Sequence, residues 1–240
     1  MIEMLVFKEA IEKLLAQEKI GRCDFHTHSF LSDGVLLPIE QLRRAFVHGH
    51  AGYGITDHVS LSTLDIIPKL IADCKLATKH WGILALPGIE VTHVPVNAIE
   101  EVIEKSIEKG ALIIVIHGET IAEPVEPGTN LKAAESKNVD ILAHPGLLTK
   151  DVANQCKKNN VFVEITSNRT HSITNGHIAK IGKESQVKFI QNTDTHSPRD
   201  MKNYEEGERI LLASGFTKKE TETILQDNIR EFLTRIYERL

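Results

Sequence analysis

The stretch ALIIVI at residues 111–116 is a continuous apolar run, and DILAH at residues 140–144 contains a shorter one. Strands of a parallel sheet have this composition because helices cover both of their faces. Other β-prone stretches occur at residues 22–26, 51–56, 83–91, 161–166 and 187–194. The sequence therefore predicts seven strands in a parallel sheet.

Amphipathic segments fill the gaps between these strands. Helical spacing of apolar residues predicts helices over roughly 38–49, 62–80, 97–109, 128–137, 149–159, 175–185 and 199–214. Gly110 suits a left-handed helix end, and Thr217 and Glu220 have the spacing of a capping box. Successive βα units of this number favour an α/β fold with a closed or nearly closed barrel, although an open doubly wound sheet also fits the pattern.

The chain has 240 residues, a mass of 26.8 kDa and an ordinary globular composition. Because no linker, low-complexity tract or internal repeat divides it, we expect a single domain over residues 1–240. Helical spacing also predicts an N-terminal helix over about 2–19, which would plug the barrel or contact another subunit, and C-terminal helices over 215–240.

Charge and cysteine usage limit the class of protein. Lys and Arg total 28 against 33 Asp and Glu, a formal net charge of −5, which argues against a non-specific nucleic-acid or anionic-membrane binder. Cys23, Cys74 and Cys156 form no C-x-x-C motif, as expected of reduced thiols. The sequence has neither the roughly 20 apolar residues of a membrane span nor a signal-peptide pattern. We predict a soluble cytoplasmic protein without a membrane partner.

Nearly every predicted strand ends in an ionisable side chain. These side chains are His26, His28 and, just beyond, Asp33, followed by His58, Glu90, His117, His144, Asp194 and His196. The carboxyl ends of the strands of a parallel barrel form one rim, where active sites are built. In His26-Thr27-His28 the two histidines project to the same side of a strand, so both imidazoles can reach one ion.

Such a set of ligands has chemical consequences. Nine candidate ligands exceed the positions around one ion, so two or three divalent ions are expected. Imidazole and carboxylate ligands without thiolate suit Zn, Mn or Fe. A carboxylate such as Glu90 can bridge two ions and hold them close enough for a shared hydroxide to form near neutral pH. The pattern therefore favours hydrolysis.

Other histidines have simpler interpretations. His48-Gly49-His50 repeats the His-x-His spacing but lies between a predicted helix and the next strand, at the opposite rim. We interpret it as a solvent-exposed helix end, which the helix dipole favours. His93, His171 and His177 lie in or beside loops at the ligand rim, where they could contact substrate or simply be exposed.

The ordered motifs DFHTHSFLSDG, ITDH, GIEV, VIHGE, LAHPG and NTDTHSPRD, between residues 22 and 200, resemble those of the PHP (polymerase and histidinol phosphatase) family of metal-dependent phosphoesterases. The resemblance implies a distorted (β/α)7 barrel with a trinuclear metal site. By resemblance, a first metal is held by His26, His28, Glu90 and Asp194, a second by Glu90, His117 and His144, and a third by Asp33, His58 and His196. The family sometimes has His at the position of Asp33.

Two arginines concern the substrate. Arg169 and Arg199 follow the last two predicted strands, and family members similar to this chain use arginines around these positions for phosphate. A guanidinium offers a rigid fork of donors that matches phosphate oxygens. Surface pairing, with Asp200 adjacent to Arg199, would explain them equally simply.

These features lead to one hypothesis and several alternatives. The hypothesis is a stand-alone, histidinol-phosphatase-like phosphomonoesterase that hydrolyses a small phosphorylated metabolite through a metal-bridging hydroxide, with Glu90, Asp194 and His196 as catalytic residues. Nucleotide phosphodiesterases and exonucleases of the family share the ligand set. A non-catalytic metal-binding module and an amidohydrolase, which would need a bridging Lys at a strand end, are further alternatives.

Overall fold

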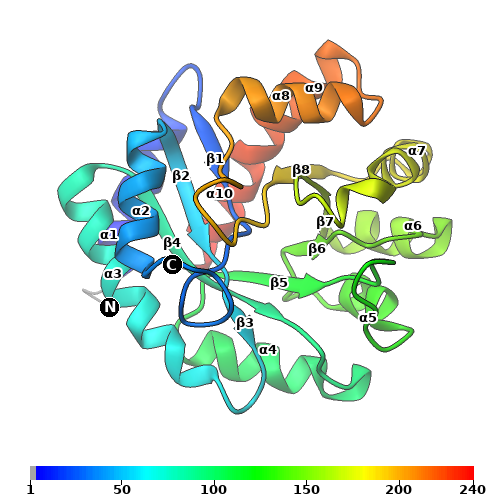
Figure 1. Ribbon diagram of the computed structural model, residues 1–240, viewed down its shortest axis with the longest axis horizontal. Coiled ribbons are helices and arrows are strands. Elements are labelled where there is room, and N and C mark those ends of the chain that lie inside the picture. Colours follow the sequence, from blue (N-terminus) through cyan, green and yellow to red (C-terminus); the bar gives the residue numbers. More distant parts are fainter. Residues whose placement is uncertain (1–3) are drawn as a thin grey trace.

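The computed structural model describes residues 4–240, whose strands form a parallel sheet curled into a barrel (Figure 1). The strands are β1 (Arg22–Asp24), β2 (His50–Ile55), β3 (His58–Val59), β4 (Leu84–Val91), β5 (Ile113–His117), β6 (Ile141–Ala143), β7 (Phe162–Thr166) and β8 (Phe189–Asn192). Seven lie in the order β1-β2-β4-β5-β6-β7-β8, and β3 pairs with β4. The predicted seven-strand parallel sheet is confirmed, and β3 is a short addition that the sequence did not reveal.

Contacts between the first and last strand segments bring the barrel close to closure. Just past β1 and β8, Thr27 and Thr195 form an isolated parallel bridge. The His28 N–H donates to the Thr195 carbonyl (2.8 Å), and the Asp194 N–H donates to the His26 carbonyl (2.9 Å). The fold is therefore a distorted (β/α)7 barrel rather than an open sheet, and its closure joins the two ends of the predicted ligand set.

Helices surround the strands (Figure 1). They are α1 (Leu5–Leu15), α2 (Pro38–Val47), α3 (Ile67–Trp81), α4 (Ile99–Glu108), α5 (Thr129–Glu135), α6 (Lys150–Asn159), α7 (Asn175–Ser185), α8 (Tyr204–Ala213), α9 (Lys218–Leu225) and α10 (Asp227–Arg239), with 3₁₀ turns η2 (Leu64–Ile66), η3 (Val96–Ala98) and η4 (Ser172–Thr174). The N-terminal helix predicted over 2–19 is the shorter α1, and residues 1–3 lie outside the described part of the chain. Among the described residues, no helix has the length and apolarity needed to cross a bilayer.

Local chemistry explains where helices begin and end. The predicted capping box at Thr217 and Glu220 opens α9, and Gly110, with φ of +96°, ends α4 as expected. The helix predicted from residue 199 begins only at Tyr204. The reason is that the Asp200 carboxylate accepts from the Ser197 N–H (2.8 Å) in a turn, and a capping box at Asn203 then starts α8.

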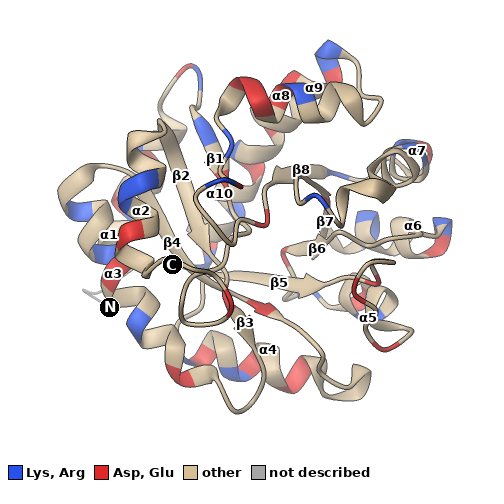
Figure 2. Cartoon of the chain, in the orientation of Figure 1, with Lys and Arg blue, Asp and Glu red and all other residues tan. Residues whose placement is uncertain are grey.

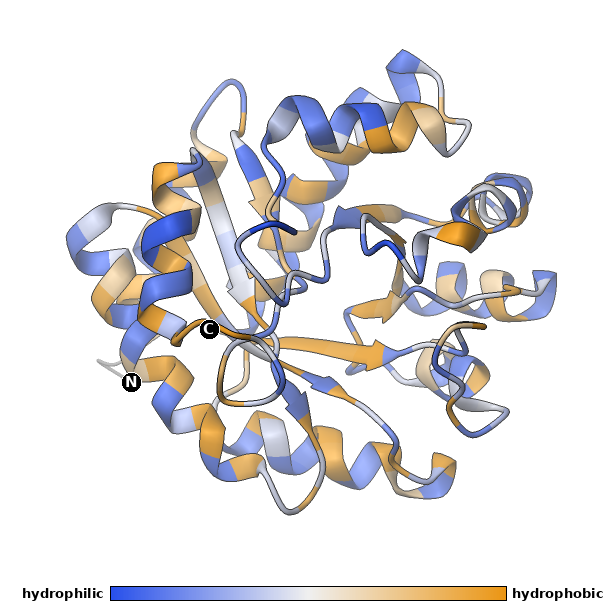
Figure 3. Cartoon of the chain, viewed as in Figure 1, coloured by the Kyte–Doolittle hydropathy of each residue, from blue (hydrophilic) through white to orange (hydrophobic). Residues whose placement is uncertain are grey.

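The core lies between the strands and the inner faces of the helices. β5 is hydrophobic along most of its length, whereas the helices carry both apolar and polar residues (Figure 3). Ile113 to Ile116 of β5 are fully buried, as expected of a strand covered on both sides. Phe232 of α10 stacks on Phe25, with ring centroids 4.8 Å apart, and meets Phe162 edge to face; Phe162 begins β7, and Asn228 of α10 donates to the carbonyl of Phe189, which begins β8. Thus α10 covers this end of the barrel together with α1, which packs against α10, α3 and β4.

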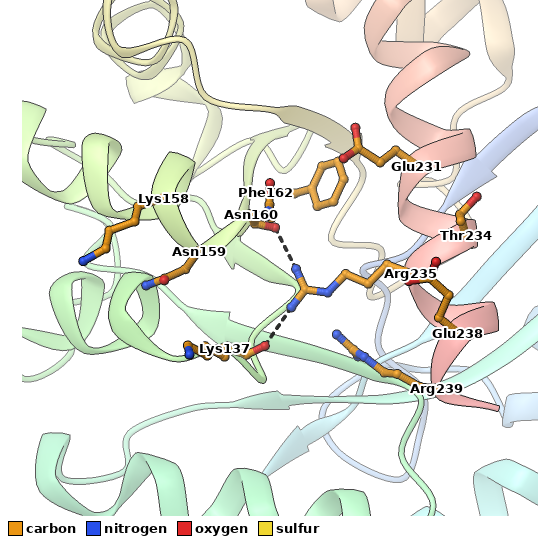
Figure 4. Close-up of a pocket in the computed structure, with 10 residues that line it drawn as sticks. All are labelled: Lys137, Lys158, Asn159, Asn160, Phe162, Glu231, Thr234, Arg235, Glu238 and Arg239. Atoms are coloured by element: carbon orange, nitrogen blue, oxygen red, sulfur yellow. Dashed lines mark hydrogen bonds between the residues drawn. The ribbon is translucent and has the colours of Figure 1, made fainter.

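Polar contacts fix α10 there. Arg235 donates to the carbonyls of Asn160 (2.7 Å), Lys137 (3.0 Å) and Val139 (2.9 Å), beside a cavity of about 590 Å³ (Figure 4). Arg239 pairs with the buried Asp140. The guanidinium groups of Arg235 and Arg239 are thus already bonded to the barrel and hold α10 in place. We therefore do not interpret this cavity, which lies at the end of the barrel opposite to the predicted ligands, as a binding site.

Candidate metal centre

All nine predicted ligands lie at one rim of the barrel, at or just past the carboxyl ends of strands. They fall into overlapping groups in which the candidate ligand atoms lie within 4.8 Å of one another. The groups are His28, Asp33, His58 and His196; His117, His144 and His171; His26, Glu90 and His144; and His26, His28 and Asp194. The structure therefore brings together every residue that the sequence assigned to metal binding, and it adds His171.

Glu90, near the end of β4, lies at the centre of these groups. Its Oε1 is 3.2 Å from His26 Nε2 and 3.6 Å from His144 Nε2. Its Oε2 is 2.9 Å from His58 Nδ1 and 3.5 Å from His28 Nε2. The carboxylate is fully buried, and neither oxygen has a hydrogen-bond partner of good geometry among the described residues. A buried carboxylate without hydrogen bonds is stable only if a positive charge lies beside it.

A second carboxylate, Glu164 in the middle of β7, orients the first histidine. Its Oε1 lies 2.8 Å from His26 Nδ1 and accepts from Asn192 Nδ2 (2.9 Å), while its Oε2 accepts from the His144 N–H (3.1 Å). With its Nδ1 proton directed at Glu164, His26 presents Nε2 to the cluster. The sequence analysis missed Glu164. The signal available was a charged residue inside an otherwise apolar strand, FVEIT.

Strained backbone places two of the ligands. His144 and Asp194 have positive φ angles of 26° and 54°, a region that non-glycine residues rarely occupy outside functional sites. Each follows a strand closely, and the unusual turn directs its side chain toward Glu90 or His28. His28 Nε2 lies 3.1 Å from Asp194 Oδ1 and 3.1 Å from His26 Nε2.

The outer part of the cluster is more open. Asp33 is 52% exposed and its Oδ2 lies 3.1 Å from His196 Nε2 and 3.4 Å from His58 Nε2. The loop that carries it is held by the buried Asp57, which accepts from the Ser29 N–H (2.7 Å) and the Ser32 hydroxyl (2.5 Å). The predicted third metal position is therefore the one nearest to solvent.

Electrostatics divide the histidines into two sets. Burial alone would lower the pKa of His58, but the carboxylates of Glu90 and Asp33 raise it to about 10. At His196 burial is likewise outweighed by Asp33 and Asp194, which raise the pKa to about 9. Burial prevails at His117 and His171 and lowers the pKa of each to about 4. Without metal, His58 and His196 are therefore cationic and pair with Asp33, whereas His117 and His171, which lie farther from the carboxylates, are neutral.

The donor set fits divalent cations. His26 Nε2 and His28 Nε2 point at each other across 3.1 Å with carboxylates on either side, and His144 Nδ1 and both Glu90 oxygens lack hydrogen-bond partners among the described residues. Opposed imidazole and carboxylate lone pairs repel unless a proton or a metal ion lies between them. These residues are nitrogen and oxygen donors of the kind that bind Zn, Mn or Fe.

The two predicted phosphate-binding arginines lie on the rim loops but outside the cluster. Arg169 and Arg199 are both exposed, in the segments that follow β7 and β8. The Asp200 carboxylate accepts from the N–H groups of His196 (3.3 Å) and Ser197 (2.8 Å). Asp200 therefore fixes the turn beside the ligands.

Two histidines differ from expectation. His50, expected to be exposed, is 96% buried because it begins β2, where its Nδ1 lies 3.1 Å from the Ala45 carbonyl; the relative exposure is 4%. His171, for which loop exposure was a sufficient explanation, is buried with its ring 4.3 Å from that of His144. A single histidine several residues beyond a strand gave no sequence signal for this placement.

The loop after β5 also reaches the site. Glu123 Oε1 lies 3.0 Å from His93 Nε2, and its Oε2 lies 3.7 Å from His117 Nε2. His93 and Glu123 border a cavity of about 280 Å³, whose other lining residues are Asp33, His58, Val59, Ser60, Thr63 and Thr92. The acidic loop therefore forms one wall of a small cavity next to the outer ligands.

Comparison with known proteins places the chain in a family. No family model matches it. Over 217 residues it is 45% identical to a Methanocaldococcus jannaschii protein named Uncharacterized protein MJ1295, covering 90% of this chain and 100% of that protein. The chain belongs to the MJ1295 family. A Thermoanaerobacter protein named Probable phosphatase Teth514_1060 is 25% identical over 237 residues, covering 88% of this chain and 93% of the relative.

Solved structures share the fold. A chain in the structure of archaeal ribonuclease P with mature tRNA has a TM-score of 0.64 at 16% identity, covering 90% of each chain. Histidinol phosphate phosphatase from Lactococcus lactis, complexed with Zn, L-histidinol and phosphate, has a TM-score of 0.58 at 15% identity, covering 82% of this chain and 94% of that one. The MJ1295 family thus uses the same barrel as these proteins.

Proposed function

We propose that this protein is a metal-dependent phosphoesterase, and specifically a phosphomonoesterase of the PHP type that acts on a small phosphorylated metabolite. The observation that carries the proposal is the buried Glu90 carboxylate, surrounded by histidines from several strand ends and lacking hydrogen-bond partners among the described residues. The relative named as a probable phosphatase and the fold shared with histidinol phosphate phosphatase support the reaction class.

Two or three divalent ions, held as the resemblance implies, would activate a water molecule and neutralise charge on the phosphoryl oxygens. The chain's own residues arrange the site for this. Glu90 and Asp194 supply buried negative charge, Glu164 fixes the His26 tautomer, and Asp33 lies at the open side where substrate enters. His196 Nε2, beside Asp33, would join Asp33 and His58 in holding the third ion, because its Nδ1 already lies 2.9 Å from the Asp194 carbonyl.

The cavity beside Asp33 favours a small substrate. Its volume is about 280 Å³, and the lining residues that the structure describes are carboxylates, hydroxyls, histidines and one valine, without Lys or Arg. Among residues 4–240, Arg22 is the one Lys or Arg in a strand, and the others lie on helices and loops (Figure 2). A nucleic-acid substrate needs several cationic contacts to its backbone, which this cavity lacks.

The surrounding loops agree with that choice. Many exposed large apolar side chains lie in segments that follow the strands, namely Phe30, Val35, Leu37, Leu61, Ile121, Leu147 and Ile173. Arg169 and Arg199 add two positive charges on the same side of the barrel, enough for one phosphate group. We therefore favour a single phosphate ester, with an apolar or polar leaving group, over a polyanionic chain.

The deciding experiment combines metal analysis with two substrates. Purified protein is analysed for bound metals and assayed on p-nitrophenyl phosphate and bis-p-nitrophenyl phosphate with Mn, Zn, Fe and Co. We expect two or three ions per chain and metal-dependent cleavage of the monoester. Preference for the diester would replace the proposal by a phosphodiesterase or nuclease, and bound metal without cleavage of either ester would contradict it.

Substitution of Glu90 tests the site assignment. We expect Glu90→Ala to abolish turnover, because His26, His58 and His144 lose the buried carboxylate that lies beside all three of them. Glu40→Ala, which removes an exposed carboxylate paired with Arg44 on α2, is the matched control and keeps full activity. A folded Glu90→Ala protein with normal turnover would overturn the assignment.

A further inference from the structure

We propose that His171 is a protein ligand of the second metal position, completing a three-histidine set with His117 and His144. This inference rests on the proposed metal centre, but it is tested by metal binding rather than by turnover. The sequence and the family resemblance assign only Glu90, His117 and His144 to this position. His171 comes from a different part of the chain, the segment between β7 and η4.

Three imidazoles, from three different segments of the chain, converge on the second metal position. One ligand nitrogen from each of His117, His144 and His171 lies within 4.8 Å of the others, and all three residues are buried. The His171 ring stacks on that of His144, with centroids 4.3 Å apart and planes inclined by 23°, and it meets His117 edge to face at 6.0 Å. Its Nε2 is 3.8 Å from Asp194 Oδ2. The imidazole therefore faces the cluster.

A hydrogen bond to the other ring nitrogen of His171, Nδ1, orients the imidazole. His171 Nδ1 lies 2.9 Å from the hydroxyl of Thr120, which is itself buried. With the hydroxyl as acceptor, Nδ1 carries the proton and Nε2 keeps its lone pair, which is how metal-bound histidines are usually oriented. His117 has the same arrangement, with Nδ1 donating to the Gly118 carbonyl at 3.0 Å.

The loop that carries His171 folds back toward the ligand cluster and is fixed by hydrogen bonds. Asn168 donates from Nδ2 to Asp194 Oδ2 (2.9 Å), and its carbonyl accepts from the Ser172 N–H (2.9 Å). Asn175 donates to the Thr166 carbonyl (2.8 Å) and closes the turn. Arg169 and Ile173, on either side of His171, are exposed. A loop that exposes its neighbours while burying one histidine against other histidines positions a donor rather than a core residue.

These contacts have a direct chemical meaning. A fourth donor gives the second position four protein ligands, namely three imidazoles and the Glu90 carboxylate, and an ion there can expand to five-coordinate to take up water. Removal of His171 therefore weakens one ion selectively, while the positions that contain His28 and Asp33 retain their ligands.

The experiment measures metal binding by His171→Ala, with His177→Ala as the matched control. His177 lies in α7, where its Nε2 is 2.9 Å from the Leu148 carbonyl, and it belongs to none of the ligand groups of the described residues. Each protein is loaded with Co²⁺, and the bound ions are counted by elemental analysis, titrated against a chelator and examined by visible absorption. We expect His171→Ala to bind one ion at least 10-fold more weakly and to change the Co²⁺ spectrum, whereas His177→Ala matches the wild type.

A second variant covers the case in which His171→Ala does not fold. Thr120→Val removes the hydroxyl that orients the ring but keeps the ligand, so we expect about 10-fold to 100-fold weaker binding of the same ion. Unchanged metal count, affinity and spectrum in either folded variant would overturn the inference. A loss of turnover with metal binding intact would instead assign His171 to the substrate, and a wild type that binds metal without phosphoesterase activity would refute the proposed function alone.

Discussion

Two His-x-His triplets lie at opposite rims of this barrel and have the same spacing. His26 and His28 follow β1 and lie among Glu90, Glu164 and Asp194. His48 ends α2 and is exposed, while His50 begins β2, where its ring meets that of Tyr53 edge to face at 5.2 Å. His26 and His50 are both buried, so burial and spacing together do not distinguish a metal site.

The distinguishing property is the charge around each ring. At His26, burial opposes protonation, but the carboxylates of Glu164, Glu90 and Asp194 raise the pKa well above its usual value. At His50, burial and the nearby Arg22 lower the pKa to about 3. One pocket attracts a cation and the other excludes one. This contrast teaches that carboxylates from other strands, and not the histidines themselves, make the first triplet a candidate metal site.

The largest expected effect comes from replacing the two buried histidines in parallel. We expect His26→Ala to lower metal-dependent hydrolysis more than 100-fold, beyond the 10-fold to 100-fold typical of residues behind a ligand, because His26 belongs to two ligand groups. His50→Asn, at the other rim, retains the activity of the wild type. Initial rates on p-nitrophenyl phosphate, with metal content determined for each protein, make the comparison. Equal losses of activity in His26→Ala and His50→Asn would show that the carboxylates around His26 do not make it a metal ligand.

The barrel itself was predictable because its signals are local. The runs in β4 and β5 are apolar up to Glu90 and His117, and the ligand residues lie at or just past the strand ends. All nine predicted ligands come together for that reason, since parallel strands necessarily carry their carboxyl ends to one rim.

What the sequence did not reveal depends on contacts between distant segments. Glu164 and His171 reach the site through the inward side of β7 and a folded-back loop, neither of which has a periodic signal. His50 was misplaced because a single residue at a helix-to-strand junction can be exposed or begin the strand. The extra strand β3 exists only because His58 and Val59 pair with Glu90 and Val91. Tertiary pairing fixed each of these details.

Glu164, which lies next to His26 Nδ1, has no charged counterpart at His50 Nδ1 among the described residues. Glu164→Gln keeps the shape of the side chain but replaces a charged acceptor, 2.8 Å from His26 Nδ1, by a neutral one. We expect metal affinity to fall by about 10-fold to 100-fold. His50 has only the Ala45 carbonyl in the equivalent place. The measurement is chelator titration of the metal-loaded protein, with Glu40→Gln as a control that keeps its affinity. Unchanged affinity in Glu164→Gln would mean that His26 needs no orienting carboxylate.

The smallest expected effect concerns stability and pH at His50. The pKa of His50 in the folded protein is about 3, below the usual 6.5. Between pH 6.5 and pH 3, His50 is therefore protonated in the unfolded chain but not in the folded protein. This term therefore destabilises the wild type as pH falls from 6.5 toward 3, by about 2 kcal/mol at pH 5.

His50→Asn retains an amide donor for the Ala45 carbonyl but has no group that titrates in this range. Urea unfolding of both metal-free proteins at pH 7.5 and pH 5.0 measures the effect, and the other histidines cancel because both proteins contain them. We expect the difference in unfolding free energy between wild type and variant to shift by about 2 kcal/mol in favour of the variant at the lower pH. The exposed His48→Asn serves as control and shows no such shift. A constant difference would mean that the His50 pocket accepts a proton, and the contrast in charge between the two triplets would then be lost.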